Sequence, residues 1–298
     1  MYSSVRWNGV FSTVYKVVAG VRQGGILSPI LFNLYVDDLI LQIKRNGVGC
    51  HIGRIFVGCI MYADDLLLLS PTIVGLQGML DICSDYGQAH DIKFNPTKSV
   101  TVFVYHKKRI IDECVSIDNQ PLSWSGSLKY LGILFDARCG LQVNSHFIKK
   151  KFYGALNSIL SKSKGLAEPI KLQLIQAYCL PILIYCLVAL VVSNSILNDL
   201  AVCWNNAFRK VFQYNSWESV KELQKFCSCI DLAHLYDILC YKFLMNINIK
   251  IPFLSMFLNT LELNHHRLVW LRHKYKCLGS GVGCFMSMVH THFNDICR

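Results

Sequence analysis

The sequence has little charge, and negative charge is the scarcer kind. Only 16% of its 298 residues are charged, 53% are hydrophobic, and 19 acidic side chains stand against 30 basic ones, which gives a net charge of +11. This composition argues against a disordered chain, and the length allows one large domain or two modest ones. Residues 1–150 carry 15 basic and 11 acidic side chains, and residues 151–298 carry 15 and 8. The basic excess, larger in the second half, favours contact with phosphate backbones.

A secretion signal is also missing, since residues 2–8 are polar and no long apolar core follows them. Most of the 14 cysteines lie in apolar segments, as Cys59, Cys179 and Cys186 do, where a free thiol packs as a small hydrophobe. The sequence therefore predicts an intracellular protein of the cytoplasm or nucleus, kept in a reducing compartment. The C-x₂₋₄-C spacing of a zinc site is absent, which favours core thiols over metal ligands. This applies to the Cys and His residues Cys227, Cys229, His234, Cys240, Cys277, Cys284, His290, His292 and Cys297.

One long segment, residues 172–198, contains no charged residue at all. It is long enough for a membrane span of about 20 residues. Gln173, Gln176 and Pro181 interrupt its apolar character. These three residues favour a buried helix, with no membrane contact expected, and leave a membrane anchor as the alternative.

Two adjacent carboxylates, Asp64 and Asp65, stand between the apolar runs of residues 55–62 and 66–69. Such runs around a polar pair predict a hairpin with buried strands and the pair at or near its turn. Neighbouring carboxylates about 4 Å apart repel by roughly 1 kcal/mol in water and roughly 4 kcal/mol near a protein surface. A cation offsets this repulsion, and carboxylate oxygens suit Mg²⁺. The alternative interpretation is a polar turn without a metal.

Two motifs carry a resemblance to a known family. The Tyr62-Ala63-Asp64-Asp65 stretch resembles the Tyr-x-Asp-Asp hairpin of reverse transcriptases. Residues 20–33, with the sequence GVRQGGILSPILFN, are similar to the preceding motif in reverse transcriptases of non-LTR (LINE-type) retrotransposons and group II introns. The resemblance runs from about Val18 to Tyr185. It implies an RNA-directed DNA polymerase that uses Mg²⁺ or Mn²⁺, an RNA template, a DNA primer and deoxynucleoside triphosphates.

The resemblance also implies roles for single residues. Asp64 and Asp65 would be the catalytic metal ligands, and Lys98, in an Asn-x-x-Lys step, would approach the triphosphate. Taken alone, Lys98 suggests only a solvated charge, and the glycines of residues 24–25 suggest an ordinary turn before a helix. Contacts to substrate or template are implied for Arg22, Gln23, Gly24, Tyr62, Ala63, Tyr130, Leu131 and Gly132.

One expected part of the family's site is missing from the sequence. In the family, another catalytic aspartate comes from a strand upstream of the Gln-Gly loop, but none of residues 1–19 is acidic. We therefore expect an N-terminally truncated polymerase that is inactive alone. The alternative is a non-catalytic nucleic-acid-binding remnant.

The predicted fold class is α+β. We expect a partial polymerase palm, an antiparallel sheet with helices, over residues 1–140, a thumb-like helical region over 141–198, and a helical C-terminal region of unknown role over 199–298. Residues 1–19 should form a strand or hairpin, and residues 100–105 a strand. Residues 127–135 should form a strand containing Gly132, and they are similar to the family's primer-grip hairpin, which holds the growing 3′ end. Residues 73–90 should form a helix with an apolar face that includes Met79 and Leu80.

A helix should begin at Ser28, as N-cap, and Pro29, and run to about Lys44. Its Asp37 and Asp38 should form a solvated face. Apolar residues at helical spacing in this helix are Ile30, Leu31, Leu34, Tyr35 and Leu41. From residue 142 the pattern is helical and basic, with a predicted phosphate-binding face of Lys149, Lys150, Lys151, Lys162, Lys164 and Lys171.

Overall fold

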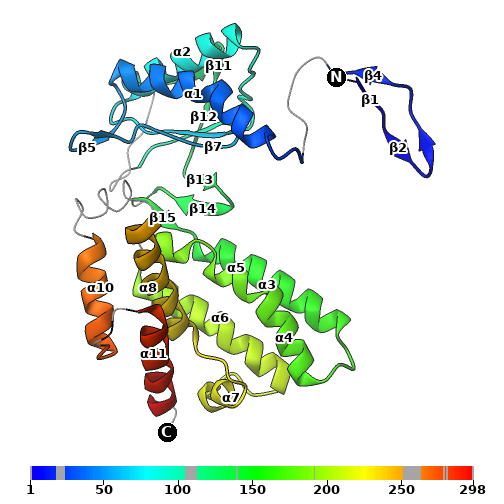
Figure 1. Ribbon diagram of the computed structural model, residues 1–298, viewed down its shortest axis with the longest axis vertical. Coiled ribbons are helices and arrows are strands. Elements are labelled where there is room, and N and C mark those ends of the chain that lie inside the picture. Colours follow the sequence, from blue (N-terminus) through cyan, green and yellow to red (C-terminus); the bar gives the residue numbers. More distant parts are fainter. Residues whose placement is uncertain are drawn as a thin grey trace. The chain divides into compact units, whose positions relative to one another are not determined.

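The chain divides into two compact units, Met1–Leu141 and Gln142–Arg298, in the computed structural model (Figure 1). The first unit combines short strands with two helices, and the second is mainly helical. The predicted α+β fold class is confirmed. The structure describes residues 2–17, 24–104, 113–138, 140–190, 192–250, 263–277, 279 and 281–296.

The N-terminal residues form a hairpin, as predicted. Its tip is a two-residue turn in which Asn8 has φ +47° and Gly9 has φ +83°. Positive φ at both positions is the requirement of a type I′ turn, and Asn-Gly is its favoured sequence. The strands pair antiparallel, β1 with β4 and β2 with β3. They are β1 (Tyr2–Ser3), β2 (Arg6–Trp7), β3 (Val10–Phe11) and β4 (Tyr15–Lys16).

The first helix, α1 (Ser28–Asn46), confirms the predicted helix but corrects its cap. Leu27 occupies the N-cap position without a side-chain hydrogen bond, and Ser28 and Pro29 are the first two helical residues. Proline is tolerated there because the first turn has no intrahelical acceptor for its missing N–H. The helix ends at Gly47, whose φ of +73° suits a C-terminal glycine.

The buried face of α1 differs from the face formed by the apolar residues that helical spacing had singled out. Val36, Leu39 and Ile43 are buried, and Asp37 and Asp38 are exposed, as expected for the two carboxylates. The helix is apolar over more than one face, so periodicity alone did not select the buried one. The exposed apolar residues are Ile30, Leu31, Leu34, Tyr35 and Leu41.

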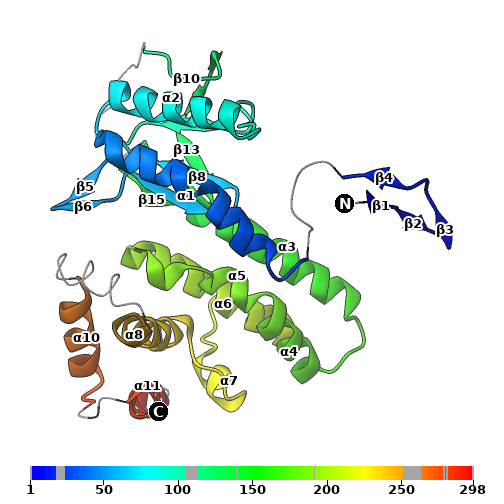
Figure 2. The same ribbon diagram turned by 45° about the horizontal axis from the view of Figure 1, so that its top comes forward.

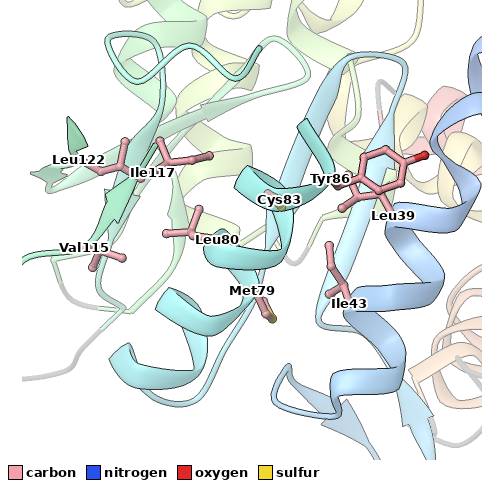
Figure 3. Close-up of a cluster of buried hydrophobic side chains, with 9 residues drawn as sticks. All are labelled: Leu39, Ile43, Met79, Leu80, Cys83, Tyr86, Val115, Ile117 and Leu122. Atoms are coloured by element: carbon pink, nitrogen blue, oxygen red, sulfur yellow. The ribbon is translucent and has the colours of Figure 1, made fainter. Parts of the chain in front are cut away.

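The core of the first unit forms where α2 (Ile73–Ala89) packs on α1 and on the strands that follow (Figure 3). Thr72 caps α2 by accepting a hydrogen bond from the Gly75 backbone N–H at 3.0 Å. Gln77 fastens the helix to a strand edge, because its amide both donates to the Ser116 carbonyl and accepts from the Ser116 N–H, each at 2.9 Å. The cluster comprises Leu39, Ile43, Met79, Leu80, Cys83, Tyr86, Val115, Ile117 and Leu122.

Short strands complete the first unit. β5 pairs with β6, β7 with β8, β10 with β11 and β13 with β14, all antiparallel, and β9 pairs with β12 in parallel. The predicted strand over residues 100–105 is present as β9, and its residue 105 lies outside the described residues. The bounds are β5 (His51–Ile52), β6 (Ile55–Phe56), β7 (Cys59–Tyr62), β8 (Asp65–Leu68), β9 (Val100–Val102), β10 (Ser116–Ile117), β11 (Gln120–Pro121), β12 (Ser123–Ser125), β13 (Ser127–Tyr130) and β14 (Ile133–Asp136).

The second unit is a set of helices packed on one another (Figure 2). Phe152 and Leu156 of α3 and Trp204 and Phe208 of α6 are fully buried, and α3 contacts α6 directly. Its elements are β15 (Gln142–Val143), α3 (Ser145–Lys162), α4 (Glu168–Tyr178), α5 (Leu180–Ile184), the 3₁₀ helix η1 (Leu187–Ala189), α6 (Asn194–Phe212), α7 (Lys221–Phe226), α8 (Leu232–Lys250), α10 (Leu263–Lys274) and α11 (Val282–Ile296).

The uncharged segment lies in α4, α5 and η1. Length and composition alone would let the stretch Glu168–Ala189 cross a membrane. The backbone is interrupted, however, since Cys186 has φ +57° between α5 and η1. A membrane span needs continuous internal hydrogen bonding, so the break argues against a span, whereas the exposure of most of the apolar window, of which 28% is buried, leaves the membrane alternative open. The buried residues of the stretch are Leu172, Ile175, Cys179, Leu183 and Leu187.

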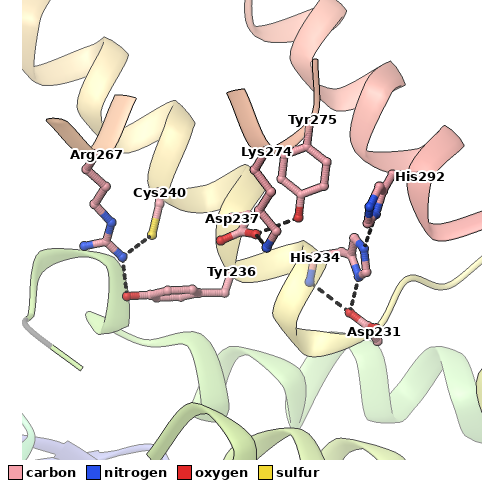
Figure 4. A network of polar contacts seen from close by, with 9 residues as sticks. All are labelled: Asp231, His234, Tyr236, Asp237, Cys240, Arg267, Lys274, Tyr275 and His292. Carbon is pink, nitrogen blue, oxygen red and sulfur yellow. Dashed lines mark hydrogen bonds and ion pairs between the residues drawn. The ribbon is translucent and has the colours of Figure 1, made fainter. Parts of the chain in front are cut away.

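Polar contacts tie the last two helices to α8 (Figure 4). Asp231 accepts hydrogen bonds from the His234 backbone N–H at 2.8 Å and from its ring Nδ1 at 2.7 Å. That bond leaves His234 Nε2 as the acceptor for His292 Nδ1 on α11, 3.1 Å away. On α10, Lys274 pairs with Asp237 at 2.5 Å. The nearby Tyr275 hydroxyl donates to the same carboxylate at 2.6 Å.

The His234–His292 contact makes the stability of the second unit depend on pH. Desolvation, followed by the charges of His234 and Lys274, lowers the pKa of His292 below its ordinary value of 6.5, while Asp295 and Asp231 oppose the shift. When the pKa of a histidine is lower in the folded state, the unfolded chain binds a proton at a pH where the folded chain does not. Lowering the pH through this range then favours the unfolded state. This contribution to stability is therefore intact above 6.5 and is lost as the pH falls through the folded-state pKa.

We predict that His292→Gln flattens the loss of unfolding free energy on acidification below pH 6.5, measured by urea denaturation at a series of pH values. His290→Gln is the control, because His290 is exposed on the same helix. It should retain the wild-type slope. A slope unchanged in His292→Gln would contradict the assignment of the pH dependence to this pair.

Candidate active site

The two adjacent carboxylates lie at the tip of the β7–β8 hairpin. β7 and β8 pair antiparallel from Cys59–Leu68 to Tyr62–Asp65, so Ala63 and Asp64 form a two-residue turn. Asp64 and Asp65 are both exposed. The predicted hairpin is confirmed, but its strands are half-buried or exposed rather than buried.

The turn carries backbone strain at Ala63, whose φ is +52°. This left-handed region is costly for a residue with a Cβ, by about 1–2 kcal/mol. The tight turn places Asp64 in the loop and Asp65 on the first strand position, opposite Tyr62. Both carboxylates thus leave one end of the hairpin, which successive positions of a straight strand would not achieve.

Residues 127–135, predicted as a strand containing Gly132 that is similar to a hairpin of the family, form a second hairpin, β13–β14. Leu131 and Gly132, with φ +44° and +82°, turn the chain back on itself. Two consecutive positive φ values define a two-residue hairpin turn. The signal available in the sequence was Gly132. Leu131 gave none, because leucine rarely adopts this conformation.

Tyr130 ends the first strand of this hairpin and lies within electrostatic range of Asp65. Burial raises the pKa of Tyr130, and the charges of Asp65 and Cys59 raise it further. Its hydroxyl is buried, and among the described residues it has no hydrogen-bond partner. An unpaired buried hydroxyl costs about 1–3 kcal/mol. Tyr130 is therefore a buried polar group, influenced by the charge of Asp65, whose hydroxyl has no hydrogen-bond partner among the described residues.

Lys98 is exposed in a tight turn that precedes β9. Asn95 builds this turn, because its side-chain oxygen accepts bonds from the backbone N–H groups of Thr97 at 3.0 Å and Lys98 at 3.3 Å. An asparagine that bonds its own following backbone is a typical turn former. The Asn-x-x-Lys spacing thus has a structural cause, and the role of Lys98 toward a triphosphate stays a prediction.

The glycine loop before α1 is described only in part. Gly24 has φ +79°, which an L-residue with a side chain adopts at a cost. Arg22 and Gln23 lie outside the described residues. The contacts predicted for these three residues remain untested.

The donor set at the hairpin tip is of the right type for Mg²⁺ but small. Asp64 and Asp65 supply hard oxygen ligands, and their exposure leaves room for water and phosphate oxygens. Among the described residues, no group of three or more His, Cys, Asp or Glu side chains is placed to hold a metal ion. The pair could therefore supply part of a metal site.

Several of the Cys and His residues of the second unit contact other side chains, while Cys297 lies outside the described residues. Cys229 lies 2.8 Å from the Gln176 amide nitrogen, Cys240 lies 3.0 Å from Arg267, and His234 is held between Asp231 and His292. Burial raises the pKa of Cys229 and of Cys240 to about 11 in each case. These thiols are protonated at neutral pH and pack as core side chains.

The basic residues of α3 divide into two groups. Lys149 pairs with Asp199 of α6 at 2.8 Å, whereas Lys150, Lys151 and Lys162 are exposed. An open hollow of about 520 Å³ on this helix is lined by His146, Lys149, Lys150 and Tyr153. The exposed lysines lie on the predicted phosphate-binding face, whereas Lys149 forms an ion pair with Asp199.

We predict that Ala63→Gly stabilises the first unit by about 1 kcal/mol, because glycine adopts positive φ without the Cβ penalty. The control is Ala201→Gly inside α6, where the backbone is helical and glycine should instead destabilise by about 0.5–1 kcal/mol. Both are measured by chemical denaturation. A loss of stability in Ala63→Gly would mean that the turn is not strained as described.

Comparison with known proteins was informative for this half of the chain. Residues 1–135 match the family model described as reverse transcriptase (RNA-dependent DNA polymerase). This match includes the N-terminal hairpin, so the resemblance begins earlier than the Val18 expected from motifs.

Several curated relatives are polyproteins or polymerases of mobile elements. The chain is 31% identical over 152 residues to the Pol polyprotein of the retrotransposable element R2DM of Drosophila melanogaster, covering 48% of this chain and 14% of that protein. It is 24% identical over 223 residues to an R2 Pol polyprotein of Popillia japonica, covering 72% and 36%. It is 26% identical over 220 residues to the RNA-directed DNA polymerase of the mobile element jockey of Drosophila funebris, covering 70% and 23%.

The chain thus spans between about one seventh and about one third of the length of these relatives. The Asp64–Asp65 hairpin and the α1 helix both fall inside the matched region. Residues 1–135 are therefore similar to reverse transcriptases, and the relatives described above are polyproteins and polymerases of retrotransposable and mobile elements.

Proposed function

We propose that the chain is the palm and thumb portion of an RNA-directed DNA polymerase of a non-LTR retrotransposon. The single observation that carries this proposal is the β7–β8 hairpin, which presents Asp64 and Asp65 at an exposed tip inside the segment matched by the family. The proposed reaction is transfer of a nucleotide from a deoxynucleoside triphosphate to the 3′ end of a DNA primer on an RNA template.

In this proposal Asp64 and Asp65 hold Mg²⁺ or Mn²⁺. A bound divalent ion would balance the charge that develops on phosphate oxygens during transfer. Asp64 is the main ligand, because it lies in the turn, and Asp65 on the adjoining strand position supports it. Tyr130, whose hydroxyl is buried and unpartnered among the described residues, adjoins Asp65 from the second hairpin.

The remaining roles follow the family motifs. Lys98 would approach the triphosphate from its Asn95-built turn. The tight turn at Leu131–Gly132 would hold the primer end, as the resemblance implies. The loop that contains Arg22, Gln23 and Gly24, together with Tyr62 and Ala63, would line the place of the incoming base pair.

A mechanism with two metal ions requires more ligands than this carboxylate pair supplies. Mg²⁺ gives up its water reluctantly and needs near-octahedral oxygen coordination, so two ions require further ligands. The described residues include no third metal-binding side chain grouped with the pair. We therefore propose that the 298-residue chain by itself does not extend a primer.

We predict no primer extension by the chain alone with Mg²⁺, and extension by a longer chain that adds an aspartate-bearing strand upstream. Asp64→Asn in the longer chain should reduce extension to background, because an amide is a weaker metal ligand than a carboxylate. The control is Asp37→Asn, which changes an exposed carboxylate on α1 and should leave extension unchanged.

Robust extension by the chain alone would disprove the need for the additional aspartate. Undiminished extension by the Asp64→Asn variant would remove the hairpin from the mechanism. Either result is read from labelled primer products on a denaturing gel.

The second candidate function is nucleic-acid binding without catalysis, and the exposed lysines of α3 favour it. Lys151 and Lys162 are eleven residues apart, which is three helical turns, so both lie on one face of α3. A row of cations along a helix can follow a phosphate backbone. This function is compatible with the first proposal and survives if catalysis is absent.

We predict that the chain binds RNA with little sequence preference and with an affinity that falls steeply between about 50 and 200 mM salt. Replacing Lys151 and Lys162 by glutamine should weaken binding and lower the salt slope by about 0.7 for each lost phosphate contact on a single strand. Lys93→Gln, an exposed lysine of the first unit, is the control. Fluorescence anisotropy measures both quantities, and salt-independent binding would contradict the prediction.

We also propose an intracellular location in the cytoplasm or nucleus. The support for this proposal is the placement of most cysteines in apolar segments, where a free thiol packs as a small hydrophobe in a reducing compartment. The membrane alternative predicts that most of the protein stays with carbonate-washed membranes through Glu168–Ala189.

A further inference from the structure

Two cysteines meet at the junction between α10 and α11. Cys277 follows the end of α10 and is 6% exposed, whereas Cys284 lies on the first turn of α11 and is exposed. Their sulfur atoms are 3.6 Å apart. One thiol is therefore protected and the other is open to solvent, and the two are in contact.

The surrounding structure holds the two thiols in place. Tyr275, two residues before Cys277, packs edge-on against Phe285, the neighbour of Cys284, with ring centroids 5.4 Å apart. Phe285 is fully buried, which anchors the start of α11. A Cβ built on Gly279 would lie 2.9 Å from the Cys284 sulfur, so the absence of a side chain at Gly279 makes the space that Cys284 occupies.

Other neighbouring thiols of the described chain lack this combination. Cys83 is fully buried, and burial raises its pKa to about 12, with the charge of Cys59 adding to the rise. Cys229 points at the Cys227 backbone carbonyl, 3.3 Å away, rather than at its sulfur. Among the described residues, Cys277 and Cys284 are the only two cysteines whose sulfur atoms are in contact and of which one is exposed.

We propose that Cys277 and Cys284 form a reversible disulfide when the protein meets a low-molecular-weight disulfide. A disulfide requires the sulfurs to come within about 2.05 Å, so they must approach by about 1.5 Å. The two cysteines are seven residues apart, and rotation of the exposed Cys284 side chain would bring its sulfur toward that of Cys277.

The chemistry balances in two exchange steps. The Cys284 thiolate attacks one sulfur of the small disulfide, which forms a mixed disulfide and releases one small thiolate that takes up a proton. Cys277 then loses its proton to water, and its sulfur attacks the Cys284 sulfur and expels the second small thiolate. The protein loses two thiol hydrogens and two electrons, and the small disulfide is reduced to two thiols.

The order of attack follows from burial. Cys284 is reached first because it is exposed. Burial and the adjacent Cys284 raise the pKa of Cys277, so Cys277 is the poorer initial nucleophile. Cys277 acts second, when the mixed disulfide has been brought to it. The disulfide would fasten the end of α10 to the first turn of α11.

The test uses the full chain with Cys297→Ser, treated with glutathione disulfide, alkylated and digested with trypsin. Cleavage after Lys276 places Cys277 and Cys284 in one peptide, and removal of Cys297 leaves them as its two cysteines. We expect this peptide to resist alkylation and to be lighter by two hydrogen atoms, and dithiothreitol should restore both thiols.

Three variants in the same background make the result specific. Cys277→Ser should stop at a mixed glutathione disulfide on Cys284, and Cys284→Ser should leave the buried Cys277 reduced. Gly279→Ala should slow disulfide formation by displacing the Cys284 thiol, with circular dichroism to confirm that its helices are retained. Cys114, an exposed thiol of the first unit, should accumulate the mixed disulfide only.

Two outcomes would overturn the proposal. One is a wild-type peptide in which Cys284 retains glutathione as stably as in Cys277→Ser. The other is a peptide in which both thiols stay reduced while Cys114 reacts.

Discussion

A tight turn between two strands is the constraint on which the proposed site depends. The pairing of Tyr62 with Asp65 leaves only Ala63 and Asp64 to reverse the chain, and Ala63 adopts a left-handed backbone conformation as a result. Two like charges side by side repel each other. At an exposed hairpin tip, water screens this repulsion until a bound cation does so. The same turn that strains the backbone thus presents both carboxylates together, which links local strain to the proposed chemistry.

The rest of the first unit holds this hairpin in place. α1 contacts both α2 and β7, and α2 is fixed to β10 by the two hydrogen bonds between Gln77 and Ser116. Tyr130, from the second hairpin, brings a buried hydroxyl within range of Asp65. The β7–β8 hairpin is thus held through α1, which α2 in turn holds, and the carboxylate pair has no third metal-binding side chain grouped with it among the described residues.

The second unit is held together by apolar packing between helices and by polar contacts. Large apolar side chains such as Trp204 and Phe208 pack α6 against its neighbours, and polar contacts of Asp231, Asp237 and Arg267 connect α8 to α10 and α11. Buried polar groups of this kind are stable only when paired, so these contacts specify how the last helices dock on α8. The basic side chains left at the surface, Lys150 among them, are the ones free to meet phosphate.

The sequence by itself determined the elements whose signals are local. Apolar runs around a polar pair predicted the β7–β8 hairpin, and helical apolar spacing predicted α2. The adjacent aspartates with the glycine-rich motif indicated a resemblance to reverse transcriptases, and residues 1–135 match that family model. These signals suffice because hydrogen-bonded turns and helix periodicity depend on neighbouring residues. The proposed roles of Lys98, Gly24 and Leu131 are still predictions from family motifs.

Tertiary structure decided the rest. α1 is apolar on several sides, and only packing against α2 selected Val36, Leu39 and Ile43 as its buried face. The turn at Leu131 depends on the pairing of β13 with β14, which overrides the ordinary preference of leucine for negative φ. The approach of Tyr130 to Asp65 and of Cys277 to Cys284 likewise depends on how the chain folds back, because burial and contact between segments are properties of the packed chain rather than of any short stretch of it.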